Sequence, residues 1–138
     1  DALRESRVPI VCSHSSCRAL CNHPRNLTDD QLRALAEKGG VAQITFYNGF
    51  LVEGDAVAGI HDAVRHILHA VSVAGIDHVG IGTDFDGDGG VRGLDSASSL
   101  IKLTEALQAE GIDHEDLEKI WGGNFLRVMR QAQAAAKE

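Results

Sequence analysis

Three short apolar runs, each followed directly by polar residues, dominate the hydrophobic pattern of this chain of 138 residues. They are Val8–Ser16, Val41–Tyr47 and Val79–Thr83. Short runs rich in branched apolar side chains are typical of strands that are buried on both faces of a parallel sheet. His14 lies at the carboxyl end of the first predicted strand, and Asp84 directly follows the third. Because ligands of parallel α/β proteins bind at the carboxyl ends of the strands, these two residues are candidates for function. We expect them to lie on one face together with Arg25, which is in the loop after the first strand.

Helical periodicity fills the segments between and after the predicted strands. Thr28 and Gln31 have the spacing of a capping box, and Gly39 and Gly40 predict the end of the helix that this box begins. The other predicted helices are Asp62–Ala74, Ser96–Ala109, a short helix capped by Asp113, and Phe125–Ala136. Gly122–Asn124 is expected to interrupt the short helix, and Asn124 can cap the last one. The order β-α-β-α-β-α-α predicts an α/β fold with a parallel sheet in a single domain, residues 1–138.

Three strands are few for a sheet in which every strand is buried. A three-stranded parallel sheet has two edges, and each open edge presents a row of unpaired backbone groups. This conflict indicates that the chain is part of something larger, either a segment of a barrel or one half of an assembly.

The candidate residues also have purely structural interpretations. Asp84 and Asp86 could simply form Asx turns at the exit of the third strand, and His14 could be a hydrogen-bonded turn residue beside its neighbouring serines. His66 and His69, three positions apart on a predicted helix, could share a metal ion. They lie off the apolar stripe of that helix, so a solvated pair is the favoured interpretation. The sequence leaves the alternatives for Asp84 and His14 open.

Charge and hydropathy exclude some classes of protein. Lysine and arginine number 13 against 20 acidic residues, which gives a formal charge of −7. No basic surface is therefore available for a nucleic acid. The sequence has neither an apolar run long enough to span a membrane nor a signal-peptide pattern. It begins at Asp1 without an initiator methionine, which leaves room for a targeting segment upstream.

The three cysteines, Cys12, Cys17 and Cys21, are odd in number and fall within ten residues of one another. Their spacing fits neither a disulfide framework nor a common zinc pattern. We therefore expect reduced and mostly packed thiols, which favours a cytoplasmic location.

Three motifs together resemble the carboxyl-terminal part of the membrane (renal) dipeptidase family of metallopeptidases. They are Ile10–Ser16 around His14, the pair Arg25 and Asn26 eleven and twelve residues after His14, and Gly82–Gly87 around Asp84. Phe46–Asn48 and Gly123–Val128 also resemble family positions in the expected order. Each motif alone is of moderate specificity, whereas their order and spacing over essentially the whole chain make the resemblance strong.

The resemblance implies a (β/α)8 metal-dependent hydrolase that holds two zinc ions and cleaves dipeptides with a bridging water. By position, it assigns His14 as a ligand of one zinc ion and Arg25 as the residue that binds the substrate carboxylate. It places Asp84 near the amino end of the substrate, as a candidate for proton transfer to the leaving amine. These roles suit the side chains, since imidazole binds zinc, a guanidinium fork fits a carboxylate and an acid can transfer a proton.

The resemblance covers only the last three β/α units of such a barrel. The family's H-x-D motif on its first strand, its metal-bridging glutamate and its other zinc histidine belong to units upstream of this match. One histidine cannot hold two zinc ions, so we expect the isolated chain to be inactive. Its missing partner is the N-terminal part of the barrel, and its open edges favour self-association into a homo-oligomer.

Two alternative functions remain open on the sequence. The chain could be a non-catalytic α/β fragment that acts as an assembly module. The length of the native gene product would distinguish this alternative from part of a dipeptidase. The barrel could instead hydrolyse another amide or an ester. Arg25 weighs against this second alternative because its guanidinium suits the free carboxylate of a dipeptide.

Overall fold

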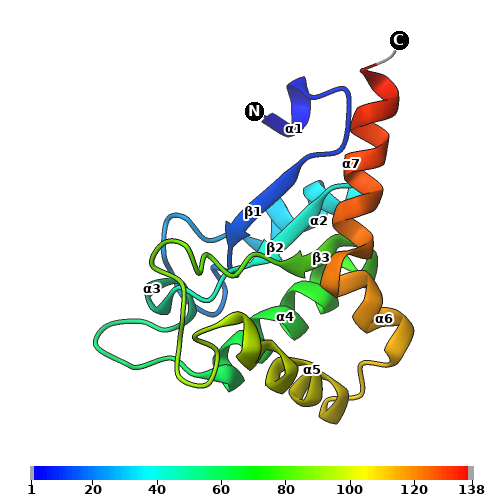
Figure 1. Ribbon diagram of the computed structural model, residues 1–138. Helices are drawn as coiled ribbons and strands as arrows, with labels where there is room; N and C mark the ends of the chain where they lie inside the picture. Colours follow the sequence, from blue (N-terminus) through cyan, green and yellow to red (C-terminus); the bar gives the residue numbers. More distant parts are fainter. Residues whose placement is uncertain (1, 137–138) are drawn as a thin grey trace.

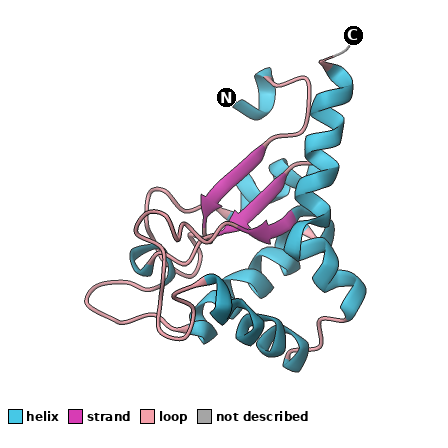
Figure 2. Ribbon diagram, in the orientation of Figure 1, coloured by secondary structure: helices cyan, strands magenta, loops and turns pink. Residues whose placement is uncertain are grey.

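A parallel sheet of three strands lies at the centre of the computed structural model, which describes residues 2–136 (Figures 1 and 2). Strands β1 (Val11–Ser15), β2 (Val41–Ile44) and β3 (Val79–Ile81) are hydrogen-bonded in that order, and both pairs are parallel. The predicted α/β fold with a parallel sheet is therefore confirmed.

The helices follow the predicted order, with short elements added. They are α1 (Ala2–Glu5), α2 (Asp29–Glu37), α3 (Asn48–Leu51), α4 (Ile60–Ala74), α5 (Leu100–Ala109), α6 (His114–Glu118) and α7 (Asn124–Ala135). Two 3-10 turns, Ile76–His78 and Ala97–Ser99, and a π-helical turn, Lys119–Gly123, join them. None of the helices described within residues 2–136 is both long and apolar enough to span a membrane.

The strands are shorter than predicted, and one of them is less buried. β2 lies between two neighbours and is buried at Val41, Ala42 and Ile44, as expected. β1 is an edge strand, and Ser13 on it is exposed. The prediction that every strand is buried on both faces is therefore wrong for β1. The other edge strand, β3, is covered by α4 and by the turn Lys119–Gly123, whereas the main contacts of β1 are with β2.

The core forms where α2 and α4 pack against each other and against β2. Leu32 from α2, Ile67 from α4 and Ile44 from β2 are almost completely buried there. The predicted capping box begins α2: the Gln31 N–H donates to Thr28 Oγ1 over 3.2 Å, and the Thr28 N–H donates to Gln31 Oε1 over 2.9 Å. A cap of this kind contributes about 1 kcal/mol to stability.

Asn124 anchors the last helix instead of capping it. The predicted interruption is present as a kink at Gly122, with φ 169° and ψ −20°, inside the turn Lys119–Gly123. Asn124 is buried, and its Nδ2 donates to the carbonyl oxygens of Ile76 and Val79, each over 2.8 Å. The predicted cap was wrong because the side chain satisfies two carbonyl groups at the start of β3, and α7 is thereby fixed to the sheet.

The segment after β2 contains the helix α3, where the sequence pattern predicts no helix. The Asn48 side chain donates from Nδ2 to the Ala56 carbonyl over 3.0 Å and accepts the Ala58 N–H at Oδ1 over 2.7 Å. These two bonds hold the following loop against the start of α3. The short helix in turn places Phe50 at the carboxyl end of the sheet, 7% exposed.

After β3 the chain runs past the carboxyl end of β2, and the backbone at Gly82 packs against β1. The Gly82 N–H donates to the Ile44 carbonyl over 3.0 Å. A Cβ at this position would lie 1.9 Å from the Ser13 carbonyl oxygen, which is backbone and cannot move aside. Only glycine permits this approach. It brings the residues that follow β3, including Asp84, towards His14 on β1.

Gly82→Ala is therefore expected to destabilise the protein by about 3 kcal/mol, the upper range for overpacking at a rigid site. Gly59→Ala is the matched control, because its Cβ would lie 3.4 Å from the nearest atom, the Arg92 carbonyl oxygen, in ordinary contact. Urea denaturation of both variants measures the difference. Equal stability of the two variants would show that the backbone at Gly82 adapts without cost.

Candidate functional site

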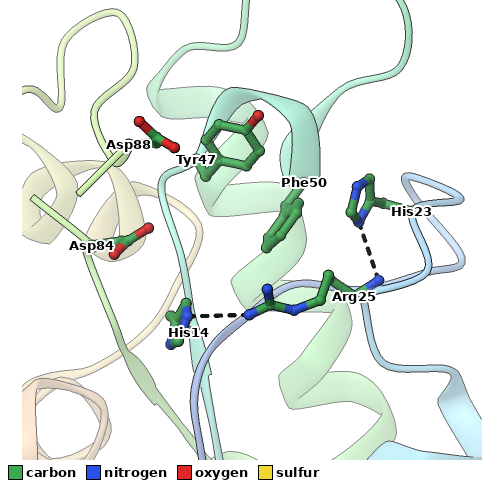
Figure 3. A pocket seen from close by; sticks show the side chains of 7 residues that line it. All are labelled: His14, His23, Arg25, Tyr47, Phe50, Asp84 and Asp88. Carbon is green, nitrogen blue, oxygen red and sulfur yellow. Dashed lines mark hydrogen bonds between the residues drawn. The ribbon is translucent and has the colours of Figure 1, made fainter.

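A cavity of about 310 Å³ opens at the carboxyl ends of the strands (Figure 3). His14 reaches it from β1, Arg25 from the segment after β1, and Asp84 from the segment after β3. The rest of the lining consists of His23, Tyr47, Phe50 and Asp88. The prediction that His14, Arg25 and Asp84 lie on one face is confirmed, whereas their chemical roles stay predictions.

His23, Phe50 and Asp88 line the cavity although no sequence motif marks them as site residues. His23 lies in a segment for which the pattern predicts no helix or strand, and Phe50 lies on α3, which the periodicity does not predict. Asp84, Asp86 and Asp88 lie at alternate positions in a segment rich in glycine. This repetition of acidic residues is the signal in the sequence that could have identified Asp88. For Tyr47, the sequence indicates only that its position resembles one in the family.

The hydrogen bonds of His14 identify its tautomer. Its Nε2 lies 3.2 Å from Nη2 of Arg25, and its Nδ1 lies 2.8 Å from Oγ of Ser13. A guanidinium group can only donate, so Nε2 must be the acceptor and carry the lone pair. The proton is then on Nδ1 and is donated to Ser13. His14 is thus a neutral imidazole with an Nε2 lone pair, the form in which histidine binds a metal ion.

Arg25 is positioned by its backbone and by an aromatic ring. Its N–H donates to Nδ1 of His23 over 3.1 Å, and its guanidinium carbon lies 5.7 Å from the centre of the Phe50 ring. His23 also packs against Phe50, with ring centroids 4.5 Å apart. Such a cation–π contact contributes about 0.5–1 kcal/mol at an exposed site. The exposed guanidinium is therefore held over the cavity without a carboxylate partner among the described residues.

Asn26 fixes the backbone beside Arg25. This side chain is 1% exposed, and its Oδ1 accepts the Ser16 N–H over 3.0 Å. Its Nδ2 donates to the carbonyl oxygens of Cys21 and Phe50 over 2.9 and 2.8 Å. One buried amide thus joins the end of β1, the Arg25 loop and α3.

Asp84 adopts a left-handed backbone conformation, φ 59°, which is rare for a residue with a side chain. The turn that follows is stabilised by backbone bonds, because the Asp84 carbonyl accepts the N–H groups of Gly87 and Gly89 over 3.0 and 2.8 Å. No described residue donates to the carboxylate of Asp84 or Asp86. The Asx-turn interpretation is therefore wrong, and the Asp84 carboxylate is available to the cavity. A positive φ of this kind is often found at functional sites.

Opposite charges lie at opposite sides of the cavity. Figure 3 shows Asp84 and Asp88 on one side and Arg25 on the other, with Tyr47 and Phe50 between them. The two aromatic rings pack edge to face, with centroids 4.9 Å apart. A small molecule that carries both an ammonium and a carboxylate group would match this distribution of charge.

The described residues do not complete a metal site. Within residues 2–136, no group of three or more histidine, cysteine, aspartate or glutamate side chains could hold a metal ion. An H-x-D spacing does occur, at His114–Asp116, but on the exposed helix α6, where His114 pairs with Glu118 over 3.5 Å. Among the described residues, His14 therefore offers a lone pair of the kind that can bind a metal ion, but it is not part of a group of three ligands.

His66 corrects the prediction of a solvated histidine pair, because it is 1% exposed. Its Nδ1 accepts the Cys17 N–H over 3.0 Å, and its Nε2–H donates to the Leu51 carbonyl over 3.0 Å. His69 is half-buried and pairs with Asp29 over 2.7 Å. The buried face of α4 is wider than the apolar stripe, because the segment after β1 and α3 also pack near it. His66 thereby fixes two segments that carry cavity residues.

The prediction of mostly packed thiols is confirmed in the described structure. All three thiols are free, and Cys17 and Cys21 are buried. Burial raises the pKa of Cys17 to about 12, and the nearby Asp29 carboxylate adds to the shift. Cys17 is therefore a packed thiol rather than a reactive thiolate.

Solved structures with the same arrangement define the class of protein. A metallo peptidase from Rhodobacter sphaeroides, liganded with a phosphinate mimic of the dipeptide L-Ala-D-Ala, superposes with a TM-score of 0.87 at 33% identity, over 94% of this chain and 38% of that one. The probable dipeptidase PvdM from Pseudomonas aeruginosa gives a TM-score of 0.90 at 29% identity, over 96% of this chain and 47% of that one. The fold is therefore that of metallopeptidases.

The chain belongs to the membrane dipeptidase family, peptidase family M19, whose family model matches residues 1–138. An uncharacterized dipeptidase of Schizosaccharomyces pombe is 40% identical over 99% of this chain and 33% of its own length. Dipeptidase tcpJ of Claviceps purpurea is 37% identical over 99% of this chain and 32% of its length. The predicted family resemblance is confirmed, and the chain spans about a third of the length of these relatives.

His66 is expected to make stability depend on pH. Burial lowers the pKa of His66 from 6.5 to about 4, so in the folded protein it stays neutral where the unfolded chain takes up a proton. The contribution of neutral His66 to the free energy of unfolding is complete above pH 6.5 and is lost progressively as the pH falls to 4. The difference between the two pKa values corresponds to a loss of about 3 kcal/mol in the free energy of unfolding.

Urea denaturation between pH 7 and pH 4 tests this dependence. His66→Gln should show a much smaller loss of stability than the wild type over this interval. His114→Ala is the control, since His114 is exposed, and it should behave like the wild type. Parallel pH curves for the wild type and His66→Gln would contradict the assignment.

Proposed function

We propose that this chain is the carboxyl-terminal part of a zinc-dependent dipeptidase with a (β/α)8 barrel. Family membership and three parallel strands with helical connections support the proposal. The observation that carries it is the cavity at the carboxyl ends of the strands, which combines the Nε2 lone pair of His14, the guanidinium of Arg25 and the carboxylate of Asp84. The chain would contribute about three of the eight strands, and the rest of the barrel would complete the site.

In this proposal the charges of the cavity orient the dipeptide. The Arg25 guanidinium binds the terminal carboxylate through two parallel N–H donors. Asp84 lies near the amino end of the substrate, and its carboxylate would accept a proton from the attacking water and pass it to the leaving amine. Tyr47 and Phe50 form the wall between these charges. The scissile bond then lies between Arg25 and Asp84, near His14.

His14 would be the single metal ligand from this chain. Its neutral imidazole and its Nε2 lone pair fit zinc. The chemistry that bound zinc supplies is activation of water for attack on a carbonyl group. Nε2 now accepts from Arg25 over 3.2 Å, so a metal ion at this atom would remove the acceptor of Arg25. The guanidinium would then be free to bind the substrate carboxylate.

The second candidate function is a non-catalytic assembly module. It is favoured by the edge position of β1 and by the absence of a three-ligand metal group among residues 2–136. The intact mass of the natural protein decides between the two. A mass near that of the relatives would supply the missing ligands, whereas a natural product of 138 residues would favour the assembly module.

In a protein of the relatives' full length that contains this chain, Arg25→Lys is expected to raise KM for a dipeptide about tenfold. Lysine keeps the charge but loses the bidentate fork, which corresponds to about 1–2 kcal/mol. Steady-state kinetics and thermal denaturation measure the effect. Arg33→Lys, at an exposed position on α2, is the control. An unchanged KM with lowered thermal stability would assign Arg25 a structural role instead.

The isolated 138-residue chain is expected to be inactive and to bind zinc weakly. A catalytic zinc site usually takes three protein ligands, and this chain provides His14 alone. The assay uses the purified chain with excess zinc and a simple dipeptide, together with measurement of zinc stoichiometry. Turnover comparable to that of ordinary hydrolases, with two zinc ions per chain, would contradict the assignment of ligands.

A further inference from the structure

A second cavity adjoins the first on the Arg25 side. Its volume is about 210 Å³, and its lining comes from two segments, residues 21–23 and 49–54. His23 lines both cavities, and its Nδ1 accepts the backbone N–H of Arg25 over 3.1 Å. A ligand whose carboxylate is bound by Arg25 therefore has the second cavity beside it, across the His23 ring.

Glu53 gives this second cavity a negative charge. Its Oε1 accepts the Asn22 N–H over 2.9 Å, which holds the carboxylate against the opposite segment of the lining. No lysine, arginine or histidine in the described part of the chain forms an ion pair with Glu53. The carboxylate is thus oriented, exposed and available to a cation that a ligand brings.

The remaining lining suits an apolar stem. Val52 contributes an aliphatic side chain, and the Cys21 thiol is turned to the Gly49 carbonyl, 3.4 Å away. At Gly54, with φ 64°, a Cβ would have no atom within 4 Å, so the rim of the cavity is open there. An alkyl chain that ends in a cation has the matching distribution of apolar and charged groups.

We propose that the second cavity binds the side chain of the substrate's C-terminal residue, and that Glu53 selects a basic side chain such as lysine. The inference rests on the proposed function, because Arg25 must hold the terminal carboxylate for the adjacent side chain to enter. The alkyl stem lies along Val52 and His23, and the ammonium group meets the Glu53 carboxylate. Glu53 is thereby a specificity-determining residue.

Paired dipeptides test this selection in the full-length protein. Ala-Lys and Ala-norleucine differ by the terminal ammonium group, so the ratio of their kcat/KM values reports the charge contact. We expect a ratio of about five, the upper range for a solvent-exposed ion pair, and we expect it to fall with added salt. Glu53→Gln keeps an acceptor for the Asn22 N–H and should bring the ratio to about one.

Two further variants make the result specific. Glu53→Lys should favour Ala-Glu over Ala-Gln, because it reverses the charge in the cavity. Asp55→Asn removes a neighbouring exposed carboxylate that lines neither cavity, and it should leave the Ala-Lys to Ala-norleucine ratio unchanged. A general loss of stability would lower both rates together and would not produce these opposite changes in ratio.

The outcomes separate this inference from the proposed function. Hydrolysis of all these dipeptides with a ratio near one in the wild type, or with a ratio that Glu53→Gln does not change, would overturn the role of Glu53 and leave the dipeptidase intact. No hydrolysis of any dipeptide by the zinc-loaded, full-length protein would overturn the proposed function itself. A ratio that falls with Glu53→Gln and not with Asp55→Asn would establish the selection.

Discussion

The close approach of Gly82 to the Ser13 carbonyl is the constraint on which the candidate site depends. β2 separates β1 from β3 in the sheet, so residues at the ends of these two strands would ordinarily lie about 10 Å apart. Because position 82 has no side chain, the chain that leaves β3 lies directly against β1. The same device recurs at Gly89, where a Cβ would lie 2.1 Å from the Thr83 carbonyl oxygen. It allows the loop to turn back and hold Asp84.

Three buried polar side chains connect segments whose relative positions the apolar core alone would not fix. Asn26 joins the end of β1 to α3, His66 joins the same region to α4, and Asn124 joins α7 to β3. Burial of apolar area is non-directional, whereas each of these groups must satisfy donors and acceptors at fixed angles. The core therefore stabilises the fold, and these polar bonds define the position of the loops around the cavity.

His14 and Arg25 show how a partial site satisfies its polar groups. In this chain the guanidinium donates to the imidazole lone pair, so each residue is the partner of the other. Under the proposed function both groups exchange this bond for external partners, His14 for a metal ion and Arg25 for a carboxylate. Binding at one residue would then release the other, which couples occupation of the metal position to recognition of the substrate.

Local patterns in the sequence determined the parallel order of strands and helices, the capping box of α2 and the placement of His14, Arg25 and Asp84 at the carboxyl ends. Periodicity and strand exits are properties of short segments, so they can be predicted from them. The burial of His66, the anchoring role of Asn124 and the contribution of His23 and Phe50 to the cavity were decided only in the tertiary structure. Each depends on contacts between segments distant in sequence, such as the 49 positions that separate Cys17 from His66, and no local pattern records such a contact.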